Sequence, residues 1–103
     1  MTRGSGNVFA DLGLPNPEQR LVKAGLVLQV HRAIEAMGVT KAEVARLTGI
    51  PQPKVSDLLA GRSQGFSIDR LMRILNNLGQ DVEIVVRPKP SEETRPAHVM
   101  VVA

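Results

Sequence analysis

Four polar side chains stand close together between Gln52 and Asp57, and they could recognise a partner through hydrogen bonds. Gln52 brings an amide, and Lys54 brings an ammonium group. In the major groove of duplex DNA an amide can bond bidentately to adenine, and an ammonium group can reach the acceptors of guanine. Ser56 and Asp57 add a hydroxyl and a carboxylate. The alternative is an ordinary solvated helix face, and the neighbouring residues must decide between the two.

The residue types that catalysis or metal binding would need are scarce. The chain has no cysteine and only two histidines, which excludes disulfides, thiolate metal sites and cysteine nucleophiles. His31 lies in an apolar helical pattern, as is typical of a hydrogen-bonded or half-exposed helix histidine, and His98 lies near the end of the chain. No nucleophile stands beside a base, and no glycine-rich phosphate loop is present. The sequence therefore predicts a protein that is not an enzyme, with no catalytic residue, metal or cofactor.

Length and composition indicate one small globular domain with tails. The 103 residues are 43% hydrophobic and 22% charged, and no apolar run resembles a signal peptide or a membrane span, so a cytoplasmic protein is expected. Only 2% of the residues are aromatic, which disfavours a stacking platform for single-stranded nucleic acid. The formal charge of +3 is a mild bias toward acidic partners. The basic excess is concentrated between residues 41 and 73, where Lys41, Arg46, Lys54, Arg62, Arg70 and Arg73 outnumber Glu43, Asp57 and Asp69.

Apolar periodicity and capping residues predict four helices that position the polar cluster. Thr40 and Ser67 stand where helix N-caps are expected, and Glu43 completes a capping box with Thr40. Gly38 and Gly49 end the first two helices. The predicted helices cover residues 18–37, about 41–47, Pro51 or Pro53 to Leu59, and 68–78.

The second and third predicted helices form a helix-turn-helix around Gly49. Val55 and Leu58 recur at a spacing that buries one side of the third helix, so the polar cluster must face outward. Pro51 and Pro53 restrict the backbone that enters this helix. This restriction holds the side chains of Gln52 and Lys54 in a defined direction.

The last predicted element is a single strand, in which Val82, Ile84 and Val86 alternate with more polar neighbours. A lone strand has no ladder partner, so we expect it to pair with the final "VMVV" or, preferably, with the same strand of a second copy. Val82, Ile84 and Val86 are therefore the predicted dimerisation residues. The expected division is an N-terminal arm (1–17), a helix-turn-helix domain (18–80), a dimerisation strand (81–87) and a flexible C-terminal tail (88–103).

The N-terminal arm carries Phe9, Leu12 and Leu14. We expect these side chains to anchor the arm on the wide apolar face of the first helix. The alternative is a segment that docks a partner protein.

The segments "TKAEVARLTGIPQPKVSDLLAGR" and "GFSIDRLMRILNNLGQDVEIVV" resemble the Xre/Cro-type helix-turn-helix family, and in particular HigA-like antitoxins and their stand-alone relatives. The resemblance extends from Val8 to Pro90. It implies a mainly α fold, namely a lambda-repressor-like bundle of about four to five helices with one C-terminal strand that pairs in a dimer.

The resemblance also implies a homodimeric repressor of a palindromic operator in double-stranded DNA, and for the antitoxin branch a cognate toxin of a HigBA-like pair. Pro51 departs from the family pattern, because many relatives have a Ser or Thr N-cap there. The other hypothesis is a protein-interaction adaptor that kept the fold but does not bind DNA. The family pattern places Gln52, Pro53, Lys54, Ser56 and Asp57 at the bases and Lys41, Arg62 and Ser63 at the phosphates.

Overall fold

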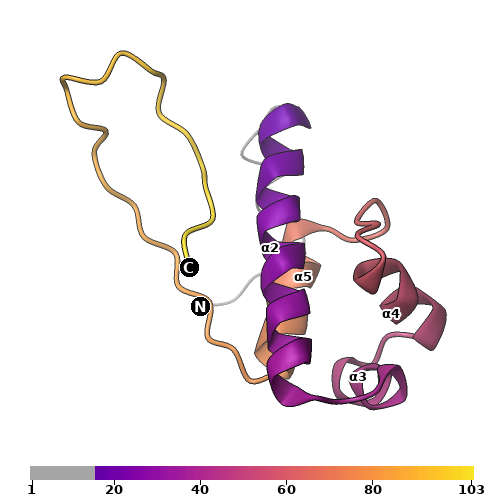
Figure 1. Ribbon diagram of the computed structural model, residues 1–103. Coiled ribbons are helices and arrows are strands. Elements are labelled where there is room, and N and C mark those ends of the chain that lie inside the picture. Colours follow the sequence, from indigo (N-terminus) through magenta and orange to yellow (C-terminus); the bar gives the residue numbers. More distant parts are fainter. Residues whose placement is uncertain (1–15) are drawn as a thin grey trace.

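The structure is a computed structural model that describes residues 16–103, and in this range it contains four helices and no strand (Figure 1). α5 packs along α2, and the shorter α3 and α4 lie to one side of this pair (Figure 1). The predicted mainly helical bundle is confirmed, and each helix boundary falls within two residues of the range expected from the sequence. The helices are α2 (Asn16–Met37), α3 (Lys41–Thr48), α4 (Gln52–Leu59) and α5 (Ile68–Asn77).

α2 has one buried face and one exposed apolar stripe. The buried residues recur every three or four positions, and they pack mainly against α5. Leu21 and Leu28 lie on the opposite side of α2, where their exposed fractions are 73% and 47%. The apolar surface predicted for this helix is therefore only partly covered within the chain. The buried residues of α2 are Val22, Leu26, Val27, Val30, Ala33 and Ile34.

Both predicted N-caps form, although one capping box is only half made. The Thr40 hydroxyl accepts a hydrogen bond from the Glu43 amide at 3.2 Å, and the Ser67 hydroxyl accepts one from the Arg70 amide at 3.1 Å. The Glu43 carboxylate turns to Arg46 rather than back to Thr40, with Nε and Oε1 2.8 Å apart. This hydrogen bond from Arg46 lowers the pKa of the Glu43 carboxyl group.

A left-handed glycine makes the turn between α3 and α4. Gly49 has φ of 74° and donates its amide hydrogen to the carbonyl of Ala45 at 2.8 Å. The next residue, Ile50, is only 5% exposed and fixes the turn to the core. Val55 and Leu58 of α4 have no exposed surface at all. α4 is therefore held to the body by one completely buried side.

The chain beyond α5 is extended and makes a wide hoop that brings its end back beside α2 (Figure 1). Val82 packs against the core where the hoop leaves, and Val99 and Val101 do so where it returns. The predicted strand over 81–87 is not formed within this single chain. Its pairing with a second copy stays a prediction.

Several sequence-based expectations concern residues that the structure does not describe. Phe9, Leu12 and Leu14 of the N-terminal arm belong to this group, and of the arm only Asn16 and Pro17 are described.

Residues 16–103 contain neither a membrane-spanning helix nor a cluster of metal-binding side chains. No helix in this range is long and apolar enough to span a membrane. The same range holds no group of three or more histidine, aspartate or glutamate residues that could bind a metal ion.

Replacing Gly49 with alanine should lower the free energy of unfolding by about 1 kcal/mol, because an L-residue at positive φ is strained. No atom beyond its neighbours in the chain lies within 4 Å of an added Cβ, so backbone strain is the only expected cause. Gly49→Asn should cost less, since asparagine tolerates this conformation better. Urea denaturation of the three proteins measures the difference. Equal stability of Gly49→Ala and the wild type would show that the turn is not held at positive φ.

Candidate nucleic-acid interface

α4 presents its front end to solvent because its other side is fixed in the core. Gln52 and Pro53 are exposed, while Lys54, Ser56 and Asp57 are half-buried along the flanks of the helix. The structure thus brings all five predicted base-contact residues to the surface of one short helix. Such a helix can enter a groove that admits a helical cylinder.

The start of α4 lacks a side-chain cap, as the departure at Pro51 implied. Pro51 is the N-cap residue with φ of −63° and ψ of 148°, and no side-chain hydrogen bond caps the helix. The backbone carbonyl of Pro51 instead accepts from the amides of Lys54 at 2.9 Å and Val55 at 3.1 Å. Pro53 has no amide hydrogen in a turn where donors would otherwise lack partners. The restricted φ angles of Pro51 and Pro53 therefore define the start of α4 in place of the usual side-chain cap.

Two predicted phosphate contacts are hydrogen-bonded to predicted base contacts. The ammonium group of Lys41 donates to the Ser56 hydroxyl at 3.3 Å. The Arg62 guanidinium pairs with the Asp57 carboxylate, with Nε and Oδ1 3.1 Å apart, and both side chains remain largely exposed. Such an exposed pair contributes little to stability, so it can exchange its partner at small cost. The arrangement keeps two cations beside Ser56 and Asp57, in the second half of α4.

The ammonium group of Lys54 lies against the loop after α4. Its Nζ is 5.5 Å from the centre of the Phe66 ring, and Cζ of Arg70 is 5.3 Å from the same centre. Phe66 is almost completely buried, so it can position both cations through its ring face. A Cβ on Gly65 would lie 2.8 Å from the Lys54 Nζ, which shows how closely the loop approaches. Sequence reasoning singled out Lys54. It did not predict that Phe66 and Gly65 would lie against the Lys54 ammonium group, or that Arg70 would share the Phe66 ring.

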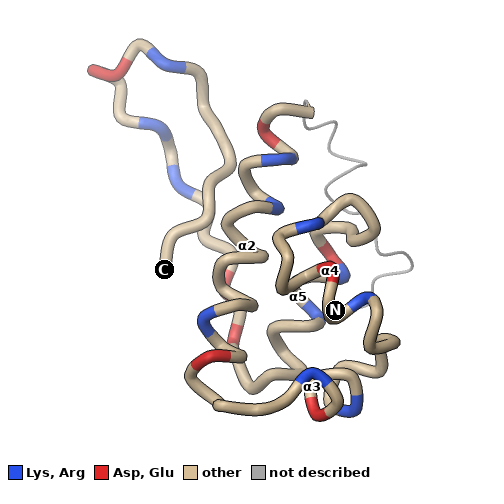
Figure 2. Tube along the Cα trace, turned by 45° about the vertical axis from the view of Figure 1, so that its right-hand side comes forward, with Lys and Arg blue, Asp and Glu red and all other residues tan. Residues whose placement is uncertain are grey.

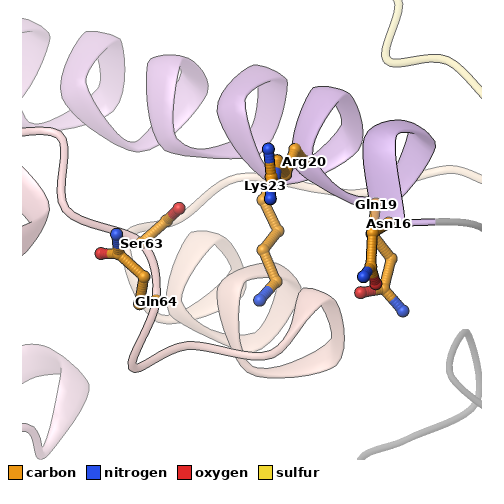
Figure 3. Close-up of a pocket in the computed structure, with 6 residues that line it drawn as sticks. All are labelled: Asn16, Gln19, Arg20, Lys23, Ser63 and Gln64. Atoms are coloured by element: carbon orange, nitrogen blue, oxygen red, sulfur yellow. The ribbon is translucent and has the colours of Figure 1, made fainter.

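A pocket of about 410 Å³ extends the polar surface from the loop after α4 to the first turns of α2 (Figure 3). The side chain of Lys23 reaches into the space between α2 and the loop that carries Ser63 and Gln64 (Figure 3). Among residues 16–103, every side chain that lines the pocket can donate a hydrogen bond and none is a carboxylate, so this lining suits an anion. The residues that line it are Asn16, Gln19, Arg20, Lys23, Ser63 and Gln64.

Sequence reasoning predicted only Ser63 among these pocket residues. Arg20 and Lys23 are some forty residues away in the chain, so no local pattern joins them to the loop. The available signal was the pair of cations three positions apart, since such a pair shares one helix face.

Positive charge is distributed over all four helices rather than gathered into one patch (Figure 2). Arg46 is neutralised by Glu43 and Arg73 by Asp69. Lys41, Lys54 and Arg70 have no carboxylate within 4 Å among residues 16–103. These three cations lie on or beside α4, since Lys41 bonds to Ser56 and Arg70 shares the Phe66 ring with Lys54.

His31 has a structural role. Its Nε2 lies 2.5 Å from the carbonyl oxygen of Leu58, so the ring donates a hydrogen bond that ties α2 to the last turn of α4. This contact agrees with the interpretation of His31 as a hydrogen-bonded helix histidine.

Comparison with known proteins gives a family and one similar structure. A family model described as a helix-turn-helix domain matches residues 8–87. A solved structure of a protein described as an XRE family transcriptional regulator is 43% identical to this chain, with a TM-score of 0.82. The match covers 86% of this chain and 99% of the other. No curated protein gives a significant match to the sequence.

Proposed function

The chain belongs to the helix-turn-helix domain family and, with its solved relative, to the XRE family, and on this premise we propose that it is a transcriptional regulator that binds double-stranded DNA sequence-specifically as a homodimer. One observation carries the proposal. α4 is fixed by the completely buried Val55 and Leu58, and it turns amide, ammonium and hydroxyl groups outward between flanking cations. Membership of a regulator family also favours a role other than catalysis.

In the proposed complex the front of α4 enters the major groove. Gln52 bonds bidentately to an adenine, and Lys54 reaches the acceptors of a guanine from its place over Phe66. Pro53 contributes apolar contact, and Ser56 and Asp57 bond to base edges farther along the helix. Asp57 would accept a hydrogen bond from a cytosine amino group, which requires it to release Arg62.

The flanking groups hold the DNA backbone. Lys41, Arg62 and Ser63 contact phosphates beside the groove, and these contacts position the protein without reading sequence. We also propose that the donor-lined pocket takes one further phosphate, between Lys23 and Arg20 of α2 and the hydroxyl of Ser63.

Dimerisation would proceed through Val82, Ile84 and Val86. Ile84 is 67% exposed and Val86 is 92% exposed, which are high values for large apolar side chains. Pairing of this segment with its two-fold copy would cover these residues and present two α4 helices to one face of the DNA. The operator should then be a palindrome with half-sites about one helical turn apart, ~34–36 Å.

The finer biological role rests on the sequence resemblance. We propose that the dimer acts as a repressor in the cytoplasm, and that it is the antitoxin of a HigBA-like pair with a cognate toxin. A second candidate is a protein-interaction adaptor that does not bind DNA. The exposed Leu21 and Leu28 of α2 favour that candidate, because they offer an apolar surface far from α4.

Reversing two charges beside α4 should abolish specific binding. Lys54→Glu with Arg62→Glu removes one base contact and one phosphate contact from each protomer, and places like charge against the DNA. We expect at least a hundredfold loss of affinity, about 2.7 kcal/mol, in fluorescence anisotropy with an operator selected from random DNA. Lys89→Glu with Arg95→Glu makes the same change in net charge on the hoop and should have a much smaller effect. Unchanged DNA binding by the α4 variant, together with retained binding of a protein partner, would support the adaptor instead.

Loss of the α2 cations should reduce the salt dependence of binding. Each neutralised phosphate contributes about 0.9 to the slope of log K against log salt concentration. Arg20→Gln with Lys23→Gln frees the one phosphate that the pocket holds in each protomer, so the dimer should lose about 1.8 from its slope. Arg32→Gln with Lys89→Gln is the matched control and should retain the wild-type slope. Equal slopes for both variants would place the pocket outside the DNA contact.

A proline in the middle of the proposed strand should separate the protomers. Ile84→Pro cannot donate to a ladder, so we expect monomers by light scattering and weaker, non-cooperative DNA binding. Ile84→Thr keeps the amide and a β-branched side chain, and should remain dimeric at high concentration. Dimers that persist in Ile84→Pro would show that the association does not use this segment.

A further inference from the structure

The hoop after α5 has two extended limbs, which form its two sides and run in opposite directions (Figures 1 and 2). We call residues 81–87 the outer limb and residues 98–102 the return limb. Neither limb is helix or strand, and within residues 16–103 neither makes a backbone–backbone hydrogen bond. Each limb therefore presents backbone groups that no ladder pairs, as at the edge of a sheet.

The return limb packs against α2 with the alternating side chains of a β-strand. Val99 and Val101 are half-buried against the core, while Met100 and Val102 between and beyond them are 61% and 74% exposed. This alternation is the two-residue period of a β-strand. The amide of Val99 also donates a hydrogen bond to the carboxylate of Glu18 on α2. The position of the return limb is thus fixed by the packing of Val99 and Val101 and by the hydrogen bond from the Val99 amide.

A glycine in α2 makes room for this seat. Gly25 lies inside the helix, where glycine costs about 1 kcal/mol relative to alanine. A Cβ at this position would lie 2.8 Å from the Cβ of Val101, closer than such atoms approach in proteins. Leu21 and Leu28 stand on the same stripe, one turn before and one turn after Gly25. The stripe is thus an apolar surface with a gap at Gly25, and among residues 16–103 the return limb partly covers it.

The outer limb differs, because its apolar side chains after Val82 are largely exposed. Ile84, Val85 and Val86 are 67%, 70% and 92% exposed. Its own return limb cannot supply the cover as the chain stands, since the two limbs form no ladder with each other. A strand placed between the limbs would satisfy both inner edges at once.

We propose that the outer limb of a second copy lies between the two limbs of the hoop, so that the return limb belongs to the dimer interface. This inference rests on the proposed homodimer and extends it from one strand to four. The order across the sheet is return limb, partner's outer limb, outer limb, partner's return limb. Two-fold symmetry makes the central pair antiparallel. Because the limbs of one chain run in opposite directions, each outer limb is then parallel to the partner's return limb.

This arrangement accounts for features that outer-limb pairing alone leaves unexplained. Both edges of each outer limb acquire ladder partners, as in recognition by strand addition. The Ile84 and Val86 side chains can share a sheet face with Val99 and Val101, and that face is turned toward the exposed leucines of α2. Gly25 then contributes to the dimer, because its lack of a side chain lets the edge strand of the sheet pack closely against α2.

Mixed labelling tests the arrangement in the intact chain. Dimers reassembled from equal amounts of isotope-labelled and unlabelled protein report contacts between chains in a filtered nuclear Overhauser experiment. We expect contacts between chains from residues 81–87 of one copy to residues 98–102 of the other. If those contacts occur only within one chain, or do not occur, the proposal is overturned. Contacts between the two outer limbs, seen at the same time, would leave the simpler homodimer standing.

A substitution at Gly25 gives an independent test. Gly25→Val should displace Val101 and raise the dimer dissociation constant by at least about tenfold, or 1.4 kcal/mol, in sedimentation equilibrium. Ala24→Val adds bulk at the next, exposed position of α2 and should change the constant by less than about twofold. Circular dichroism checks that both variants keep their helices. Equal dissociation constants for the two variants would overturn the role of the return limb, and a monomeric wild type would overturn the homodimer as well.

Discussion

The burial of one side of α4 is the constraint on which the rest of the candidate site depends. Val55 and Leu58 are completely buried, and Ile50 anchors the turn that precedes them. Since residues three apart lie on one face of a helix, this burial leaves the positions between them no route inward. The outward direction of Ser56 and Asp57 is therefore set by apolar packing, which is strong and independent of salt. The polar groups themselves do not have to orient the helix.

The cations around α4 are held by interactions that a phosphate or a base can replace. The ring of Phe66 attracts Lys54 and Arg70 without neutralising them, and the hydroxyl of Ser56 does the same for Lys41. Only Arg62 has a carboxylate partner, and this pair is exposed. A net charge of +3 is modest for a DNA-binding protein, but Lys41, Lys54 and Arg70 lie on or beside α4. Local placement can therefore compensate for a small total charge.

The sequence predicted what local chemistry controls and missed what distant segments bring together. The caps at Thr40 and Ser67 and the turn at Gly49 could be read directly, because each acts within a few residues. The position of the Lys54 ammonium group depends on Phe66, which lies beyond the end of α4, and the pocket joins Lys23 to Ser63 across forty residues. The seat of Val101 on Gly25 joins the last residues to the first helix. Periodicity carries no information about such pairings.

The path of the chain after α5 links the two halves of the proposed mechanism. Leu78 is 3% exposed at the end of α5 and Val82 packs against the same core, so only a few residues separate the fixed body from the outer limb. A connection this short transmits direction, because it leaves few backbone angles free to vary. The return limb adds a second attachment of the same hoop to α2, near Gly25. If two copies join through these limbs, both attachments constrain how each body is turned about the two-fold axis. The distance between the two α4 helices, and hence the operator spacing that the dimer accepts, would then be set by the sheet rather than by the DNA.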